Sequence, residues 1–245
     1  MDLLNLMQSH VSVRDFDKAP LDKNVKEKLV LAAHSASTSN FVQAVSIIDI
    51  TDMNLRKKLA EISGSDAYVM NTGAFFVFVA DLHRQAHILE QNGQSLAGVS
   101  SMESLTVSVV DTALAAQNMA LEAEALGLGI CYIGGIRNDI FEVANLLNLP
   151  DHTVPLFGLT IGKPLSKNAV KPRLPLANFY SENGYDEASF TDLRAYDEIT
   201  EKYYGNRQTN EQITNWSEKN REFFAEIRRP QVAEFLKKQG FSLES

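Results

Sequence analysis

The sequence of 245 residues is poor in cysteine, in positive charge and in long apolar runs. Cys131 is its single cysteine, so no intramolecular disulfide can form and stability must come from burial, as is usual in a reducing compartment. The 23 Lys and Arg residues are outnumbered by 31 Asp and Glu residues, which gives a net charge of −8. This balance argues against a general binder of nucleic acid or of acidic membrane surfaces, so any anion site must be local.

No segment of the sequence has the character of a membrane span. The longest apolar stretch, residues 105–128, contains Asp111, Glu122 and Glu124, whose charges are too costly in lipid. The first ten residues carry Asp2 where a secretory signal carries positive charge, and their spacing is typical of a short amphipathic helix. We therefore expect a cytoplasmic protein without a membrane partner.

Several common catalytic motifs are also missing, including the Walker A loop and the G-x-S-x-G elbow. His83 and His87 form the one histidine pair with helical spacing, and because a third ligand is lacking we expect no metal site. The glycines of residues 127–129 follow a predicted helix and precede a strand, whereas a dinucleotide fingerprint requires the reverse order. Cys131 lies in an apolar run without an activating neighbour.

Hydrophobic periodicity predicts a globular fold that contains both helices and strands. Besides the short N-terminal helix, three stretches of the core are predicted to be helical, at residues 21–33, 102–126 and 139–147. Four apolar runs predict strands, at residues 45–50, 74–80, 130–133 and 154–161. We expect 45–50 and 74–80 to be central strands, and 74–80 to be buried on both faces. The alanine-rich helix 102–126 should pack closely on its neighbours.

The character of the sequence changes after residue 165. Prolines, asparagines and glycines interrupt the pattern there, and residues 196–240 then mix charged and aromatic residues at helical spacing. This stretch is too short and too charged to carry its own core. We therefore predict a single domain over residues 1–245, with a core at 1–165 and an extension at 166–245.

Residues 10–14, HVSVR, form the first candidate anion site. If the segment is extended, His10, Ser12 and Arg14 project to the same side and can all reach one phosphate. When so short a pattern is considered alone, an ordinary polar loop is the favoured interpretation.

A second cationic segment lies about 160 residues further along the chain. Lys171 and Arg173 flank Pro172, whose fixed φ stiffens the segment and lowers the entropy lost on gripping an anion. Taken alone, a solvated basic turn is the simpler interpretation.

Two polar segments complete the set of candidates. Ser37, Thr38, Ser39 and Asn40 follow a predicted helix and either bind a polyol or complete a turn, and the turn is favoured. Residues 132–135, YIGG, end a predicted strand, where backbone N–H groups can approach a planar ligand without a Cβ in the way. A plain tight turn is the alternative there.

Taken in order, six segments of the chain resemble the nitroreductase family: HVSVR, SASTSNFVQ, VVDTALAAQNMALEAEALGLG, YIGGIRNDI, PLFGLTIGKP and KPRLP. The similarity is to the larger oxygen-insensitive NADPH-dependent nitroreductases and NADPH–flavin oxidoreductases, and it continues through RRPQVAEFLKKQG. The resemblance implies an α+β fold with a mixed, mainly antiparallel central sheet flanked by helices. It also implies a homodimer with FMN at two interface sites and a C-terminal extension that embraces the partner subunit.

The resemblance further implies roles for individual residues. His10, Ser12, Lys171 and Arg173 would hold the FMN phosphate and ribityl chain. Arg14 would lie at the N1/O2 edge of the flavin, where reduction builds negative charge that a cation stabilises. The other residues expected to line the cofactor are Ser37, Thr38, Ser39, Asp66, Tyr132, Ile133, Gly134 and Gly135.

The same resemblance implies a substrate side of the site. Asn40 and Phe41 would border the substrate pocket, while Arg207 and Arg229 would contact the nicotinamide nucleotide. Residues 210–213, NEQI, stand where arginine is more usual, which weakens the preference for NADPH over NADH.

Two positions depart from the family pattern near the flavin. Val11 stands in place of an arginine, and Asp66 in place of a glutamine that would touch the ring. A carboxylate beside an electron-accepting ring disfavours its anionic reduced form. We therefore expect an altered flavin potential or a local rearrangement around Asp66.

The sequence thus predicts an FMN-dependent oxidoreductase that passes two electrons from NADPH or NADH, with NADPH favoured, to nitroaromatics, quinones or related small molecules. The expected mechanism is ping-pong, with hydride transfer at the flavin N5, which requires no catalytic side chain. Two alternatives remain open. One is a flavin reductase that releases reduced flavin, and the other is a flavin-binding or sensor protein without turnover.

Overall fold

The computed structural model describes residues 2–206 and 212–243. The chain divides into two compact units, one formed by Met1–Asn168 with Arg229–Ser245 and the other by Ala169–Arg228. The chain therefore leaves the first unit after its last strand and returns to it at Arg229. A single domain over residues 1–245 stays a prediction.

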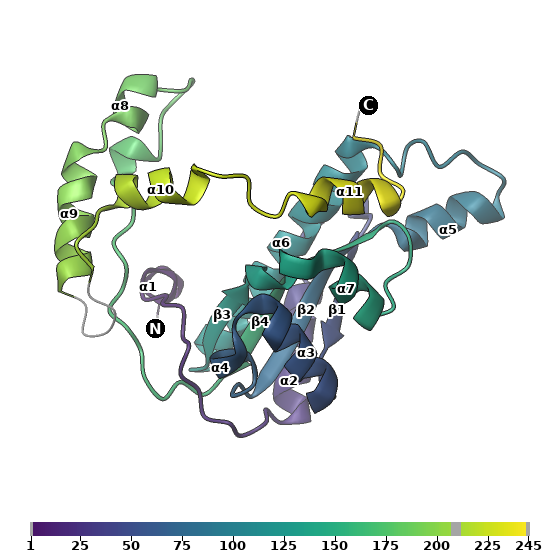
Figure 1. Ribbon diagram of the computed structural model, residues 1–245, viewed down its shortest axis with the longest axis horizontal. Helices are drawn as coiled ribbons and strands as arrows, with labels where there is room; N and C mark the ends of the chain where they lie inside the picture. The colour runs from purple at the N-terminus through teal and green to yellow at the C-terminus, as the bar shows by residue number, and fades with distance from the viewer. Residues whose placement is uncertain (1, 207–211, 244–245) are drawn as a thin grey trace. The chain divides into compact units, whose positions relative to one another are not determined.

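The first unit is built around a four-stranded antiparallel sheet in the order β1-β2-β4-β3 (Figure 1). Its strands are β1 (Val45–Asp49), β2 (Ala74–Asp81), β3 (Gly129–Ile133) and β4 (Thr153–Gly162). All four predicted strands are confirmed, and a parallel bridge between Ser12 and Ile130 gives the arrangement its mixed character. The prediction of a central strand at 45–50 is wrong, because β1 is an edge strand and its residues are only partly buried. A short run of β-branched residues indicates a strand, but it does not indicate whether that strand has one neighbour or two in the sheet.

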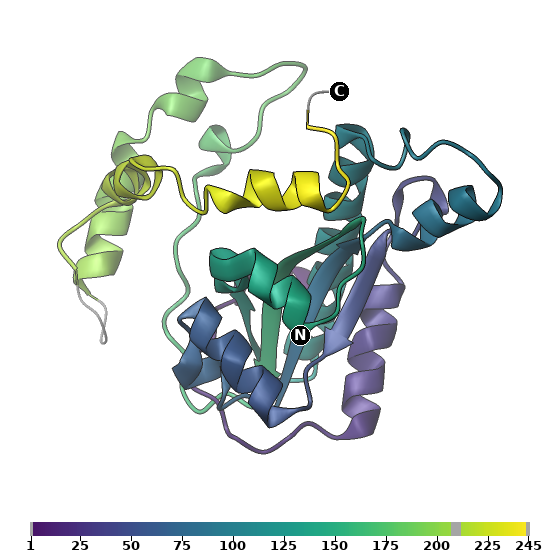
Figure 2. The same ribbon diagram turned by 45° about the vertical axis from the view of Figure 1, so that its right-hand side comes forward.

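Helices pack on both faces of this sheet (Figure 2). The helices of the first unit are α1 (Leu3–Gln8), α2 (Lys23–His34), α3 (Met53–Ser63), α4 (Asp66–Val69), α5 (His83–Gln91), α6 (Met102–Ala125), α7 (Ile140–Leu146) and α11 (Gln231–Lys238), with 3₁₀ turns η1 (Ser39–Phe41) and η2 (Gly134–Asp139). The predicted helices at 21–33, 102–126 and 139–147 correspond to α2, α6 and α7, and the short helix predicted in the first ten residues is α1. Among the described residues no helix is both long and apolar enough to cross a membrane.

Strand β2 determines how the helices are distributed. All eight of its residues are buried, as predicted. Because side chains alternate along a strand, Phe76 and Phe78 pack under α2 and the alanine-rich face of α6, while Phe75 and Val77 pack under α3 and α7. One apolar strand therefore belongs to two hydrophobic cores.

Helix α3 was not predicted from the sequence, although its ends are well defined. The Asp52 carboxylate accepts the backbone N–H of Leu55 at 2.7 Å and caps the first turn. Gly64 ends the helix in a left-handed conformation with φ 62°. The helix carries many charged residues, which hide its buried face from a search for apolar periodicity.

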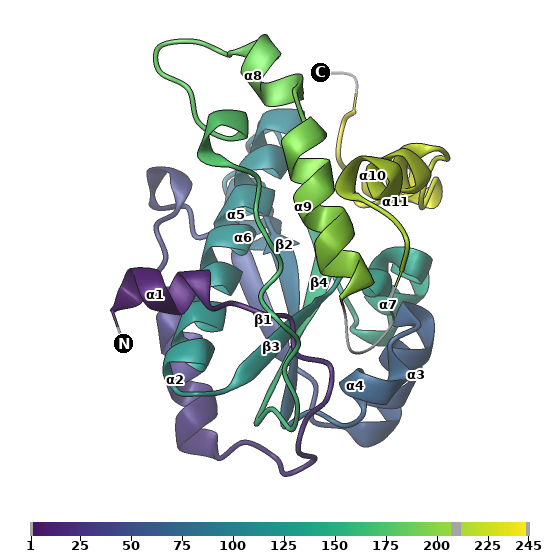
Figure 3. The same cartoon turned by 90° about the vertical axis from the view of Figure 1, so that its left-hand side faces the viewer.

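The second unit is helical (Figure 3). Its elements are η3 (Leu176–Asn178), α8 (Glu187–Thr191), α9 (Arg194–Gly205) and α10 (Trp216–Phe224). Helices α9 and α10 pack through the Tyr196 and Trp216 rings, whose centroids are 5.7 Å apart. The Thr200 hydroxyl and the Asp197 carboxylate accept the first backbone N–H groups of α10. The predicted helical character of residues 196–240 is thus confirmed in α9, α10 and α11.

The C-terminal segment of the first unit is anchored around His152, which has a left-handed backbone with φ 61°. Its backbone N–H donates to Gln239 at 2.8 Å, and its Nε2 lies 3.1 Å from the Ser100 hydroxyl. The ring also fills the space beside Gly240, where a Cβ would stand 3.0 Å from Nε2. Burial lowers the pKa of His152, and the charges of nearby acidic groups oppose this shift.

We predict that acid loosens this anchor. Because the folded-state pKa of His152 lies below its ordinary value of 6.5, its contribution to stability is complete above that pH and is lost as the pH falls through the lowered value. The protection factors of the α11 amides, which are their exchange rates corrected for the intrinsic pH dependence of amide exchange, should fall between pH 7 and pH 5. His152→Asn should remove most of this fall, whereas His87→Asn, on an exposed face of α5, should retain it. Protection factors of the wild type that stay constant between pH 7 and pH 5 would contradict the prediction.

Candidate functional site

The HVSVR segment is extended, as predicted, and runs beside β3. The backbone N–H of Val13 donates to the Ile130 carbonyl at 2.8 Å. Val13 is buried in the space left by Gly129, where a Cβ would stand 2.6 Å from a Val13 methyl group. Since alternate side chains project to opposite sides, the inward Val13 leaves Ser12 and Arg14 facing away from the core.

Arg14 lies exposed near β3 and acts on Cys131 in that strand. Burial raises the pKa of the Cys131 thiol, and the positive charge of Arg14 offsets part of this rise. The thiol is 3% exposed, so it is an inert core group, as expected. The cation therefore lies close to the strand, on the exposed side of the segment.

His10 is oriented by a carboxylate that the sequence did not indicate. Its Nδ1 lies 2.6 Å from Oε1 of Glu124, in the last turns of α6. Both side chains are largely buried, at 28% and 13% exposure. A carboxylate on one ring nitrogen fixes the ring and leaves Nε2 as the nitrogen that can bind a ligand. A glutamate in an alanine-rich helix is the only signal that the sequence offered for this contact.

Tyr132 and Ile133 lie on opposite faces at the end of β3. The Tyr132 ring is half-exposed and meets Phe157 edge-on at 5.3 Å, while Ile133 is buried. Burial raises the pKa of Tyr132 to about 12, and the Glu124 carboxylate adds to the rise. The phenol therefore stays protonated, and can donate a hydrogen bond, throughout the neutral range.

Gly134 and Gly135 begin η2 instead of forming only a tight turn. A Cβ on Gly135 would stand 2.2 Å from the Ser63 carbonyl oxygen at the end of α3. The absence of a side chain at this position is thus required by packing within the first unit. A contact of this backbone with a planar ligand stays a prediction.

The polar run after α2 forms an irregular loop. Three of its non-glycine residues have left-handed backbones, Asn40 (φ 45°), Phe41 (φ 59°) and Gln43 (φ 52°), each of which costs about 1 kcal/mol or more. The Thr38 hydroxyl accepts the Gln43 N–H at 3.3 Å and so takes part in the turn. A contact of this residue with a cofactor stays a prediction. Ser37 is exposed beside it.

Asp111 holds this loop from below. The carboxylate is 1% exposed in the middle of α6, and its two oxygens accept the backbone N–H groups of Ser39 at 3.0 Å and Ala44 at 3.1 Å. Sequence reasoning missed this role, because 72 and 67 residues separate the partners. The sequence did offer one indication of this role, because Asp111 is a carboxylate in the middle of an otherwise apolar predicted helix.

Asp66 is exposed in the first turn of α4. A negative side chain is favourable at this end of a helix. This local placement explains an acidic residue at the position without reference to a flavin. The expected effect of Asp66 on a flavin potential stays a prediction.

Lys171 and Arg173 belong to the second unit, whereas His10, Ser12 and Arg14 belong to the first. The Pro172 carbonyl between the two cations accepts the Tyr196 hydroxyl at 2.9 Å, which ties this segment to α9. Both basic side chains are exposed. Joint binding of one phosphate by the two cationic segments stays a prediction.

Arg229 lies in the first unit beside an arginine that sequence reasoning missed. Its Nε donates to the Asn138 amide oxygen at 2.9 Å. Burial lowers the pKa of Arg137, and the like charge of Arg229 lowers it further. Two guanidinium groups therefore lie close together at the end of η2. Arg207 lies outside the described residues, as do Asn210 and Glu211.

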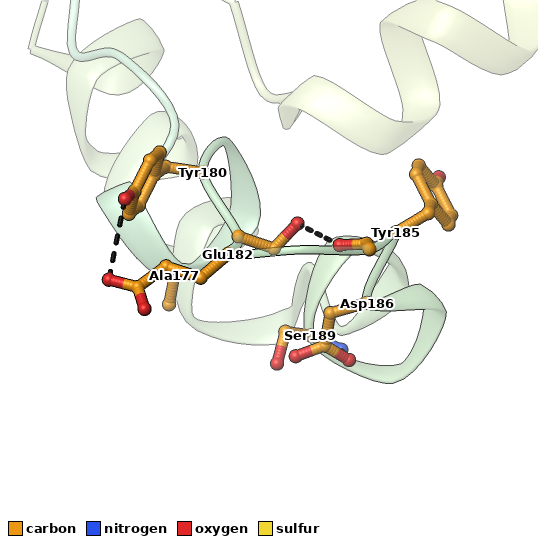
Figure 4. Close-up of a pocket in the computed structure, with 8 residues that line it drawn as sticks. Ala177, Tyr180, Glu182, Tyr185, Asp186 and Ser189 are labelled. Carbon is orange, nitrogen blue, oxygen red and sulfur yellow. Dashed lines mark hydrogen bonds between the residues drawn. The ribbon is translucent and has the colours of Figure 1, made fainter.

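An open cavity of about 520 Å³ lies in the second unit between η3 and α8 (Figure 4). Its lining includes Tyr180, Glu182, Tyr185 and Asp186, and the Tyr180 hydroxyl lies 3.5 Å from Glu182. None of the predicted site residues lines this cavity. Across residues 2–206 and 212–243, no group of three or more His, Cys, Asp and Glu side chains could hold a metal ion.

The fold and these residues together define a class of protein: an α+β domain with helices on both faces of an antiparallel sheet and an exposed N-terminal cation beside an edge strand. The chain belongs to the nitroreductase family. The family model matches residues 7–163, and that of the "Nitroreductase family, C-terminal domain" matches residues 171–244. The predicted fold class is confirmed.

Similar proteins cover nearly the whole chain. A "CR(VI) reductase" of Pseudomonas sp. (strain G-1) is 43% identical, with 97% of this chain and 98% of the relative aligned. An "FMN reductase (NADPH)" of Bacillus subtilis (strain 168) is 39% identical, with 96% of each aligned. The structure of NfrA1 from B. megaterium matches with a TM-score of 0.94 and 40% identity, over 98% of this chain and 99% of that one.

We predict that Gly135→Ala destabilises the first unit by about 1–3 kcal/mol, because the new Cβ must displace the backbone of Ser63. Thermal unfolding should show this as a fall of roughly 2–4 °C per kcal/mol. Gly98→Ala is the control, since a Cβ there meets nothing within 4 Å. Equal melting temperatures for the two variants would contradict the close approach of η2 to α3.

Proposed function

We propose that this chain is an FMN-dependent oxidoreductase that transfers two electrons from NAD(P)H, with NADPH favoured, to nitroaromatics, quinones or related small molecules by a ping-pong mechanism. The observation that carries the proposal is the extended segment beside β3, from which Ser12 and Arg14 face away from the core. An exposed, positioned cation in a protein of net charge −8 suits an anionic ligand.

The donor set of the first unit fits FMN. Ser12 and the hydroxyls of residues 37–39 are polar groups of the kind that bind a phosphate or a ribityl chain. With both of its ring nitrogens protonated, His10 donates from Nδ1 to Glu124 and from Nε2 to the phosphate. Bound flavin supplies the two-electron chemistry, accepting hydride from the nucleotide and passing electrons to the acceptor.

The remaining roles belong to cations. Arg14 favours a ligand that gains negative charge on reduction, since a fixed cation lowers the energy of the charged form. Lys171 and Arg173, on a segment stiffened by Pro172, grip the phosphate with little loss of entropy. Arg229, with Arg137 beside it, provides positive charge for the phosphates of the nicotinamide nucleotide. Asn40 and Phe41 border the acceptor pocket.

We further propose that the protein is a cytoplasmic homodimer. Helix α6 buries one face against the sheet, yet Val109, Val110 and Leu114 on its other face are 37%, 50% and 44% exposed. Leu3 and Leu4 of α1, which packs on α6, are 59% and 58% exposed. Exposed apolar side chains on two helices that pack together are typical of an interface between identical subunits. The C-terminal extension would embrace the partner.

A second candidate is a flavin reductase that releases reduced flavin, and the similarity to an FMN reductase (NADPH) favours it. The same donor set supports both activities, because they differ only in the acceptor. Assays with added free FMN separate them: a flavin reductase accumulates free reduced FMN, whereas a nitroreductase consumes the nitroaromatic and leaves free flavin oxidised.

Anaerobic mixing with NADPH and with NADH tests the proposed function. Bound flavin should lose its visible absorbance within seconds with NADPH, and more slowly with NADH. If neither nucleotide bleaches a bound yellow cofactor within minutes, the chain is a flavin-binding protein without turnover. A protein that cannot be reconstituted with FMN at all would defeat every flavin-based interpretation.

Arg173→Ala should weaken FMN binding, because it removes a charge-assisted contact worth about 1.5–3 kcal/mol. This energy corresponds to a roughly ten- to hundredfold higher dissociation constant, measured by flavin fluorescence. Lys18→Ala, which removes an exposed charge outside the proposed site, is the control. An unchanged dissociation constant for Arg173→Ala would refute its assignment to the phosphate.

A further inference from the structure

The loop at residues 38–44 has two features that lower the stability of the fold: backbone strain and an exposed aromatic side chain. Its tip holds Asn40 and Phe41 in left-handed conformations, and the Phe41 side chain is 81% exposed. Backbone strain persists only where surrounding contacts over-determine it, and it is concentrated at functional sites. We therefore looked for contacts that hold the strained backbone in place and for a role of the exposed Phe41 ring.

The first restraint is the Asp111 carboxylate in α6. Its oxygens bind the N–H groups of Ser39 and Ala44, one on each side of the strained tip. Charge-assisted bonds inside a protein are strong, and the carboxylate is 1% exposed. The two ends of the loop are thereby fixed to one rigid helix.

The second restraint comes from α5 and acts on the carbonyl groups of the same loop. Arg84 donates through Nη2 to the carbonyls of Gln43 at 3.0 Å and Val45 at 2.8 Å. Gln85 donates to the Val42 carbonyl at 2.6 Å. The Arg84 guanidinium is itself held by the Asp81 carboxylate at 3.1 Å, at the end of β2.

We propose that Asp111, Arg84 and Gln85 are positioning residues that lock the loop so that Phe41 presents its ring to planar acceptors. This inference rests on the proposed function, in which Phe41 borders the acceptor pocket. Aromatic rings recognise flat π-systems by stacking, and a ring fixed in advance loses less entropy on binding. The locked loop therefore selects quinones and nitroaromatics over acceptors that have no flat face.

The test uses Asp111→Asn in the FMN-loaded protein. An amide keeps one acceptor oxygen but turns an NH₂ group toward the second N–H, so one end of the loop is released. With NADPH saturating, the KM for 1,4-benzoquinone should rise on the order of fivefold, the value of one stacking contact. The KM for hexacyanoferrate(III), an octahedral anion without a flat face, should change less than twofold.

Two further measurements separate positioning from a general loss of stability. Without turnover, hydrogen exchange at the amides of Ser39 and Ala44 should accelerate in Asp111→Asn, while exchange in β2 stays slow. In a double-mutant cycle, adding Asp111→Asn to Phe41→Ala should not raise the benzoquinone KM further. Independent, multiplicative effects of the two changes would overturn the proposal.

Arg84→Lys keeps the test decisive if Asp111→Asn fails to fold. The Arg84 side chain is 51% exposed, and its two terminal nitrogens hold the two carbonyls and the Asp81 carboxylate at the same time. A lysine has only one nitrogen for these partners, so a selective rise of the benzoquinone KM is again expected. Arg221→Lys, an exposed change in α10, is the matched control. Normal turnover with an unchanged benzoquinone KM in Arg84→Lys and in any folded Asp111→Asn overturns this inference alone. A wild-type flavin that no nucleotide reduces overturns the proposed function instead.

Discussion

The burial of β2 on both faces is the constraint on which the first unit depends. Eight consecutive buried residues cannot face water on either side, so helices must cover the sheet twice. Phe75 and Phe76, neighbours in sequence, consequently anchor two different cores. Helices α6 and α3, which cover the two faces, then bring Asp111, Glu124 and the end of α3 to the places where the site residues lie.

Helix α6 has several structural roles because its faces carry different side chains. Its alanines allow α2 and the sheet to come close, while its interior carboxylate holds the loop that carries Phe41. Near its end Glu124 orients His10. A helix that is fixed by packing on the sheet is a better support for polar contacts than a loop is, since its side chains move little. Asp111 and Glu124 therefore connect the hydrophobic core, on which α6 packs, to the residues of the proposed site.

The sequence was sufficient to predict the four strands, because each is a short run rich in apolar or β-branched residues, and to recognise the family from segments spread along the chain. It was misleading for residues 45–50, where an edge strand has the composition of a central one. The contacts of Asp111 and Glu124 were beyond reach, since they join residues 67 to 114 positions apart and follow from packing alone. Charged helices such as α3 were not predicted, because only a narrow stripe of their residues is buried and the apolar periodicity is correspondingly weak.

The return of the chain to the first unit at Arg229 gives residues 169–228 the topology of an insertion. An inserted segment is tethered at both ends, so it explores less space than a free tail and loses less entropy when it docks. It can also change in length or sequence between related proteins while β4 and α11 keep their places. Variation in the part that carries Lys171 and Arg173 is thereby uncoupled from the folding of the sheet.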